Sequence, residues 1–308
     1  MSILFVAQHR EMAPFKSAIE KLDPNMDVEI WPHVKKPERV QFAVAWNHPK
    51  NVFDAFPNLQ VISSLGAGVD HLFADKTIPK NIRFTRVVAP SLSDQMCDYV
   101  LGSVLNILQK TETYYDQQKK AGWKPQKTYR KKDLSVGVMG LGAIGKKVAE
   151  RLALNGFSVA GWSNSKKEIK GIKTFSASQL DSFLTQTNIL VCLLPLTTET
   201  EGILDLKLFK KLNKPAFVIN VARGEHLVEE DLIYSLDIDL INHAILDVFS
   251  KEPLPESHPF WGRDKITITP HIASVTDADE VADLLLDNYK RLLSDMDLLY
   301  EVDRKKGY

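Results

Sequence analysis

Residues 134–145, LSVGVMGLGAIG, constrain the fold more than any other part of the sequence. The apolar run 134–139 is typical of a buried parallel strand, and a helical pattern follows it. Between them, Gly140, Gly142 and Gly145 have the G-x-G-x-x-G spacing. In that spacing the first glycine permits a tight turn, the second lets a pyrophosphate approach bare backbone amides, and the third lets the helix pack close to the strand. The stretch therefore indicates a dinucleotide-binding turn.

Two other interpretations of the glycine turn are open. It could be an ordinary strand-to-helix turn, although the flanking strand and helix favour a bound anion at the helix N-terminus. The letters GLGAIGKK also come close to a P-loop. However, Lys147 stands where a P-loop needs the Ser or Thr hydroxyl that holds magnesium. We therefore favour the dinucleotide.

Length and charge limit the class of protein. A chain of 308 residues exceeds the usual size of one core, so two domains are expected. Lys plus Arg number 39, as do Asp plus Glu, which argues against a nucleic-acid partner. We see no signal peptide and no membrane span, and we expect a soluble, cytoplasmic protein. Cys97 and Cys192 have no CxxC partner and are expected to be buried hydrophobes; no metal-binding spacing is seen.

Short apolar runs alternate with helical patterns in both halves of the chain, which predicts parallel sheets covered on both faces. A long helix over 91–120 is expected to lead out of the first domain. A helix over 278–294 is expected to cross back and complete it. The expected strands lie at residues 3–7, 28–31, 42–45, 59–64, 134–139, 158–162, 189–194, 217–221, 244–248 and 266–269.

A second glycine turn occurs in the first domain, where LGAGVD at 65–70 follows an expected strand. Its exposed backbone amides could hold a carboxylate, as the other turn could hold a phosphate. A tight turn without a ligand is the alternative.

The choice of nicotinamide cofactor depends on the end of the second strand of the dinucleotide domain. An acid about twenty residues beyond the glycines grips the ribose 2′-hydroxyl in NAD-binding folds. Here the sequence is GWSNSKK at 161–167, without an acid. Its hydroxyls, amide and lysines, with Ser163, Asn164, Ser165 and Lys166 foremost, suit a 2′-phosphate, so NADP is preferred and NAD is the alternative. The lysines could instead belong to a solvated loop.

Three segments that follow strands each carry one reactive group: Arg223 in NVARG, Glu252 in DVFSKEP and His271 in TPHIAS. Reduction of a 2-ketoacid by hydride needs a cation for the carboxylate, an acid for the new alkoxide and a partner for that acid. Arg223 offers a fork matched to a carboxylate, and His271 can donate a proton near neutral pH. Glu252 would orient the imidazole and favour its charged form. Each alone could be a surface or packing residue.

These residues lie in motifs that resemble the D-isomer specific 2-hydroxyacid dehydrogenase family, and within it the enzymes that reduce glyoxylate and hydroxypyruvate. The matching pieces span nearly the whole chain: LGAGVD at 65–70, GLGAIG at 140–145, LLPLTTETEGIL at 193–204, NVARG at 220–224, ILDVFSKEPLPESHPFW at 245–261 and TPHIAS at 269–274.

The resemblance implies an α/β protein of two doubly wound domains, a Rossmann dinucleotide-binding domain (104–276) inserted in a flavodoxin-like substrate domain (1–103 plus 277–308). It implies that Arg223, Glu252 and His271 are catalytic, with His271 the acid in reduction. It also implies a homodimer. The substrate contacts would be Trp46, Ala67, Gly68, Arg223 and His271, with packing in the core as the alternative for Trp46. The cofactor contacts would be Gly140, Gly142, Ala143, Ile144, Gly145, Ser163, Asn164, Ser165, Lys166, Met96, Leu194, Pro195, Val221, Ala222, Arg223, Asp247, His271, Ala273 and Ser274.

The sequence therefore predicts an NADPH-dependent reductase of a small 2-ketoacid, glyoxylate or hydroxypyruvate first. The alternative is a non-catalytic, dinucleotide-sensing interaction protein, as in the family's corepressor relatives. The presence of the Arg, Glu and His argues against that alternative.

Overall fold

The computed structural model describes residues 2–8 and 10–304, and the chain divides into two compact units. Unit 1 comprises Met1–Leu92 and Val275–Tyr308, and unit 2 comprises Ser93–Ser274. The first boundary thus lies earlier than the expected 103/104, because Met96, Val100 and Val104 are buried in a core cluster of unit 2. The second boundary lies two residues before the expected one.

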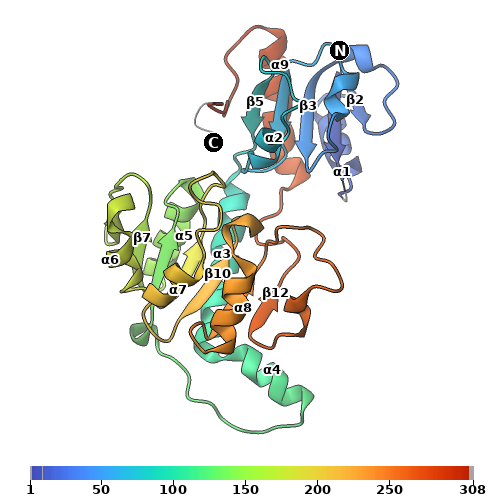
Figure 1. Cartoon of the computed structure of the whole chain (residues 1–308). Coiled ribbons are helices and arrows are strands. Elements are labelled where there is room, and N and C mark those ends of the chain that lie inside the picture. Colours follow the sequence, from blue (N-terminus) through green and yellow to red (C-terminus); the bar gives the residue numbers. More distant parts are fainter. Residues whose placement is uncertain (1, 9, 305–308) are drawn as a thin grey trace. The chain divides into compact units, whose positions relative to one another are not determined.

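Unit 1 contains a parallel sheet whose strand order is β2-β1-β3-β4-β5, the flavodoxin-like order. The C-terminal helix α9 (Figure 1) contributes Val281 and Leu285 to the same buried cluster as Ile3 and Phe5 of β1 and Phe15 of α1. The chain therefore returns to complete this unit, as expected. Its elements are β1 (Ser2–Ala7), α1 (Ala13–Leu22), β2 (Asp27–Ile30), η1 (Pro37–Arg39), β3 (Val40–Trp46), η2 (Val52–Ala55), β4 (Val61–Ser64), α2 (Asp70–Ala74), β5 (Arg83–Arg86) and α9 (Ala278–Leu293).

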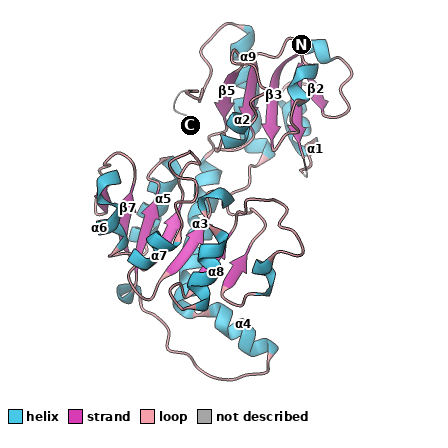
Figure 2. Ribbon diagram, viewed as in Figure 1, coloured by secondary structure: helices cyan, strands magenta, loops and turns pink. Residues whose placement is uncertain are grey.

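Unit 2 contains a parallel sheet of order β12-β11-β10-β9-β6-β7-β8, the Rossmann order with β12 added at one edge. Helices lie on both faces of this sheet (Figure 2). Its elements are α3 (Pro90–Gln109, which begins in unit 1), α4 (Thr111–Lys119), η3 (Lys131–Asp133), β6 (Ser135–Met139), α5 (Ala143–Leu154), β7 (Ser158–Trp162), β8 (Lys173–Phe175), η4 (Ala177–Gln179), α6 (Leu180–Leu184), β9 (Ile189–Cys192), α7 (Leu206–Lys211), β10 (Phe217–Asn220), η5 (Gly224–His226), α8 (Glu229–Asp237), β11 (His243–Leu246), η6 (Pro259–Gly262) and β12 (Ile266–Ile268).

The central strands of unit 2 are apolar on both sides because each face of the sheet has its own core. In β9, Leu190 and Cys192 belong to one buried cluster, whereas Ile189 and Val191 belong to the other. Successive side chains of a strand point to opposite faces, so a continuous apolar run is what a doubly covered strand requires. The predicted fold class, two doubly wound α/β domains, is confirmed.

The structure differs from the predicted elements in two places. The helix expected over 91–120 is broken at Lys110, which has a left-handed φ of 55°, so α3 ends at Gln109 and α4 begins at Thr111. The strands β5 and β8 were not predicted, because both are short edge strands with polar sequences, RFTR and KTF. Within residues 2–8 and 10–304, every helix is too short or too polar to serve as a membrane span.

Candidate active site

The glycine turn joins β6 to α5 and is built as the spacing predicts. Gly140 has a φ of +102°, a conformation that side-chain-bearing residues avoid. A Cβ on Gly145 would overlap the Gly140 carbonyl oxygen, so only glycine lets α5 approach the strand this closely. Gly142 precedes Ala143 and Ile144 at the start of α5, and a Cβ there would meet no heavy atom within 4 Å.

No side chain caps the N-terminus of α5, which begins at Ala143, and the first N–H groups of a helix have no partner within the helix. Unpaired amides at a helix N-terminus bind anions, and the helix dipole adds to the attraction. This turn therefore fits the pyrophosphate of a dinucleotide.

The loop after β7 carries the residues predicted to select between NADP and NAD. Ser163 is buried, and its hydroxyl donates a hydrogen bond to the Ser165 carbonyl at 2.8 Å. This hydrogen bond fixes the conformation of the loop. Asn164, Ser165 and Lys166 are exposed beyond it. No carboxylate lies at residues 161–167, where a ribose 2′-hydroxyl would need one.

The other predicted residues of unit 2 are gathered at the carboxyl edge of its sheet, where ligands of such folds bind. Met96 is the exception, because it lies in α3, buried in the same cluster as Ala273. The edge set is Leu194 and Pro195 after β9, Val221, Ala222 and Arg223 after β10, Asp247 after β11, and His271, Ala273 and Ser274 after β12.

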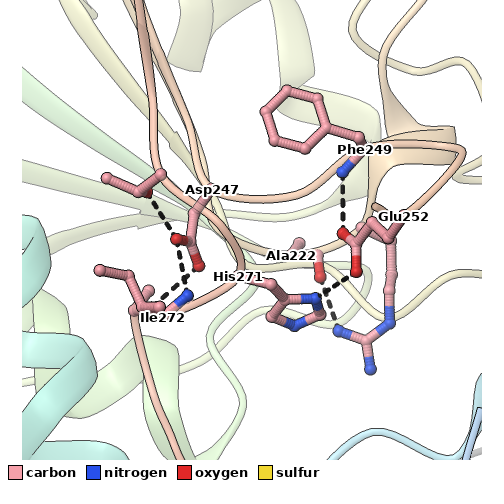
Figure 3. A network of polar contacts seen from close by, with 9 residues as sticks. Ala222, Asp247, Phe249, Glu252, His271 and Ile272 are labelled. Carbon is pink, nitrogen blue, oxygen red and sulfur yellow. Dashed lines mark hydrogen bonds and ion pairs between the residues drawn. The ribbon is translucent and has the colours of Figure 1, made fainter. Parts of the chain in front are cut away.

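His271 and Glu252 are joined by a hydrogen bond at this edge. The His271 Nδ1 atom lies 2.7 Å from the Glu252 Oε2 atom, and the backbone N–H of Phe249 donates to Glu252 Oε1 at 3.0 Å. Figure 3 shows the imidazole and the carboxylate facing one another, with Phe249 above the carboxylate. The carboxylate is thus fixed at both oxygens. With Nδ1 committed to Glu252, the ring can exchange a proton through Nε2.

Asp247 positions the loop that carries His271. Its side chain is 1% exposed and accepts hydrogen bonds from Thr269 Oγ1 (2.6 Å) and from the backbone N–H groups of Ile272 and Ala273 (2.9 Å each). His271 has a left-handed φ of 55°, and its N–H donates to the Asp247 carbonyl at 2.9 Å. A non-glycine residue keeps such a backbone only where its surroundings impose it. Sequence reasoning had given Asp247 only a cofactor contact.

Arg223 lies beside the pair, on the loop after β10. One of its guanidinium N–H groups donates to the Ala222 carbonyl at 2.6 Å. The next residue, Gly224, packs so closely against the Phe249–Ser250 backbone that a Cβ would overlap it. This packing ties the Arg223 loop to the loop of Glu252. His226, three residues beyond Arg223, is fully buried, and its Nε2 atom lies 3.3 Å from the Pro195 carbonyl oxygen.

The charge of Glu252 is set by opposing effects. Burial raises the pKa of its carboxyl group, but the hydrogen bond and charge of His271, the Phe249 N–H and the charge of Arg223 lower it, and the net pKa lies below the ordinary value. Glu252 is therefore ionised at neutral pH. Burial raises the pKa of Tyr99 to about 12, which keeps its phenol protonated at 2.5 Å from Thr269 Oγ1.

In unit 1, the predicted substrate residues Trp46, Ala67 and Gly68 lie at the turn of residues 65–69. The Ser64 hydroxyl donates to the Gly68 carbonyl at 2.6 Å and accepts from the Gly66 N–H at 3.3 Å, so one side chain holds the turn. The Trp46 indole lies against Gly66, where a Cβ would be 2.7 Å from its Cζ3. Ala67 and Gly68 lie within the turn.

Both cysteines are buried, and burial raises the pKa of the Cys192 thiol to about 12, as expected of a small hydrophobe rather than a nucleophile. Among the described residues, no three His, Cys, Asp or Glu side chains gather into a group that could hold a metal ion.

Comparison with known proteins matches this geometry to one family. The sequence model of the "D-isomer specific 2-hydroxyacid dehydrogenase, NAD binding domain" matches residues 101–273. The glyoxylate/hydroxypyruvate reductases A of Photorhabdus laumondii and Yersinia enterocolitica are 35% and 33% identical, each over the whole of both chains.

Two solved structures are similar over the full length. The D-isomer specific 2-hydroxyacid dehydrogenase of Xanthobacter autotrophicus in complex with NADPH and MES has 35% identity and a TM-score of 0.92, covering 100% of this chain and 99% of that one. The NADPH-dependent glyoxylate/hydroxypyruvate reductase of Sinorhizobium meliloti, in complex with NADP and sulfate, has 33% identity and the same TM-score, covering all of both chains. The chain therefore belongs to the D-isomer specific 2-hydroxyacid dehydrogenase family of NAD(P)-dependent oxidoreductases.

Proposed function

We propose that this protein reduces a small 2-ketoacid, glyoxylate or hydroxypyruvate, to the D-2-hydroxyacid with NADPH, and that His271 is the general acid. The observation that carries the proposal is the contact of His271 Nδ1 with a carboxylate that the Phe249 N–H fixes from the other side. Relatives with the name glyoxylate/hydroxypyruvate reductase A, similar over their whole length, support the substrate class.

NADPH, when bound, supplies the hydride that adds to the keto carbon. His271 delivers the proton from Nε2 to the keto oxygen, and the ionised Glu252 stabilises the imidazolium before that transfer. In the reverse direction the neutral imidazole takes the proton from the hydroxyl. Asp247 holds the loop so that the ring keeps this orientation.

Arg223 binds the substrate carboxylate and polarises the ketone, because its planar fork suits a bidentate contact with a carboxylate. In unit 1, the backbone amides of Ala67 and Gly68 are donors suited to a carboxylate of the substrate, and Trp46 contributes an apolar wall. In support, the Ser64 hydroxyl fixes the turn that carries these amides.

NADP is the preferred cofactor, with NAD as the alternative. The amides of residues 142–145 would hold the pyrophosphate, and Ser163, Asn164, Ser165 and Lys166 would hold the 2′-phosphate. The lack of an acid at residues 161–167 supports this preference, as do relatives solved with NADPH or NADP. The nicotinamide half would be lined by Met96, Leu194, Pro195, Val221, Ala222, Asp247, Ala273 and Ser274. The protein acts as a homodimer.

A panel of 2-ketoacids, assayed with NADPH and with NADH in parallel, tests the activity and the cofactor preference together. We expect turnover of glyoxylate or hydroxypyruvate, with a higher kcat/KM for NADPH. His271→Ala should lower kcat by about 10²-fold or more, because proton transfer by a positioned side chain contributes that much. The dissociation constant of NADPH should change little. NADPH binding without turnover of any ketoacid would instead favour the sensing alternative.

A further inference from the structure

Unit 1 contains a buried histidine and aspartate pair for which the reaction described above has no use. The Nε2 atom of His48 lies 3.0 Å from Asp75 Oδ2, and the two side chains are 2% and 5% exposed. Asp75 is held in place from its other oxygen, because Oδ1 accepts hydrogen bonds from the Thr77 N–H (2.9 Å) and the Thr77 hydroxyl (2.6 Å).

The pair joins the two segments that carry the unit 1 residues of the proposed substrate site. His48 lies two residues beyond Trp46, on the loop that follows β3. Asp75 is the residue after α2, and the 65–69 turn leads directly into that helix. A hydrogen bond between His48 and Asp75 therefore fixes the Trp46 loop relative to the helix that begins at the turn.

Packing of rings transmits this constraint to the Trp46 side chain. The His48 ring lies 4.8 Å from the Phe53 ring and 6.0 Å from the His71 ring, between ring centroids. His71, in α2, in turn lies 5.2 Å from Trp46, whose indole covers Gly66. Moving the His48 ring would thus shift His71 and with it the indole that lies against the turn.

Burying this polar pair costs free energy, so packing alone does not explain why a histidine and an aspartate fill the space. The His48 Nδ1 atom is buried and has no hydrogen-bond partner in the described part of the chain. Burial lowers the pKa of His48, opposed by the hydrogen bond and charge of Asp75, so the neutral ring donates its Nε2–H to the carboxylate. Apolar side chains of similar volume would fill such a site without burying a polar group.

We propose that His48 and Asp75 are positioning residues for the 2-ketoacid, which hold Trp46 against the 65–69 turn so that the turn amides and the indole form a preformed wall for the substrate. This inference rests on the proposed function, because it concerns how unit 1 presents the same substrate. It assigns the pair an effect on substrate binding, not on proton transfer or on the cofactor.

The test compares two variants that disturb the same carboxylate in different ways. Asp75→Asn should raise KM for glyoxylate and hydroxypyruvate about tenfold, with kcat changed less than about threefold, because loose positioning weakens binding of substrate and transition state together. Thr77→Val removes one hydrogen bond to Asp75 but leaves the His48 contact, and it should change KM by less than about twofold. The NADPH dissociation constant and the melting temperature are measured for both.

If Asp75→Asn does not fold, the His48 variants replace it. His48→Gln keeps an N–H donor for Asp75 and should retain a KM near that of the wild type, whereas His48→Ala should raise it. A raised KM in Asp75→Asn or His48→Ala, without loss of NADPH binding, supports the proposal. An unchanged KM with only a lower melting temperature shows a structural role and overturns it. A wild-type protein that reduces no 2-ketoacid overturns the proposed function and this inference together, whereas an active wild type with unaffected variants overturns this inference alone.

Discussion

In the proposed reaction, the charge of Glu252 acts directly on the proton donor. The effects of His271, Phe249 and Arg223 outweigh burial and hold its pKa below the ordinary value. The negative charge is therefore present throughout the neutral range and is lost only as the pH falls through that lowered pKa. Above it, the carboxylate stabilises the charged imidazole at 2.7 Å.

Glu252→Gln keeps the shape of the side chain but removes this charge. We expect kcat/KM for ketoacid reduction at neutral pH to fall by about tenfold or more, because the amide removes the negative charge that faces the imidazole of the proposed acid. Steady-state kinetics with glyoxylate and NADPH measure it. Glu229→Gln is the matched control, because Glu229 pairs with His258 at 3.0 Å outside the proposed mechanism. A Glu252→Gln variant that keeps the kcat/KM of the wild type would contradict the role of Glu252.

In the strand–turn–helix element formed by β6 and α5, substitutions of two glycines are expected to have different effects. One should weaken cofactor binding alone, and the other should also destabilise the fold. Gly142 has an extended backbone with φ −70° and open space where a Cβ would lie, whereas a Cβ on Gly145 would overlap the Gly140 carbonyl. Gly142→Ala should raise the NADPH dissociation constant about tenfold or more, since the methyl group would occupy the space proposed for the pyrophosphate. The melting temperature without cofactor should change by less than about 4 °C.

Gly145→Ala is the counterpart, and it should lower the melting temperature and the affinity together because α5 must move away from β6. Fluorescence titration with NADPH and thermal unfolding of the apoprotein give both quantities. Normal NADPH binding by Gly142→Ala would show that the cofactor phosphates lie elsewhere.

The elements that the sequence predicted well are those whose signal is local. The glycine turn and the apolar runs of β6 and β9 follow from spacing and from burial on both faces of a sheet. The break at Lys110 was missed because a lysine with a left-handed φ has no sequence signature. The function of Asp247 as the anchor of the His271 loop depends on contacts from Thr269, Ile272 and Ala273, which only the folded loop brings to one carboxylate.

At the scale of the whole molecule, the sequence predicted two doubly wound units and a C-terminal helix that returns to the first of them. It placed the first boundary too late, because helical periodicity does not reveal which core a crossing helix joins. In α3, the residues from Met96 onward pack in the core of unit 2. The division of a long helix between two units is a property of tertiary packing.

The homodimer is the remaining prediction at this scale, and α4 with the loop after it is the segment that argues for it. No residue of α4 is buried, and within unit 2 this helix and its loop extend away from the sheet (Figure 1). Trp123, in that loop, is 96% exposed, and Tyr115 is half exposed. Exposed aromatic side chains gathered on one segment are typical of a surface that a partner covers.

We therefore expect a dimer in sedimentation analysis of the wild-type protein at micromolar concentration. Trp123→Ser should raise the dissociation constant of the dimer about tenfold or more, because a buried aromatic anchor contributes strongly to an interface. Trp261→Ser is the control, since Trp261 is also exposed but its indole N–H donates to the Pro255 carbonyl of its own chain at 2.9 Å. A wild-type monomer, or a Trp123→Ser variant that associates as tightly as the wild type, would show that another surface or none joins the subunits.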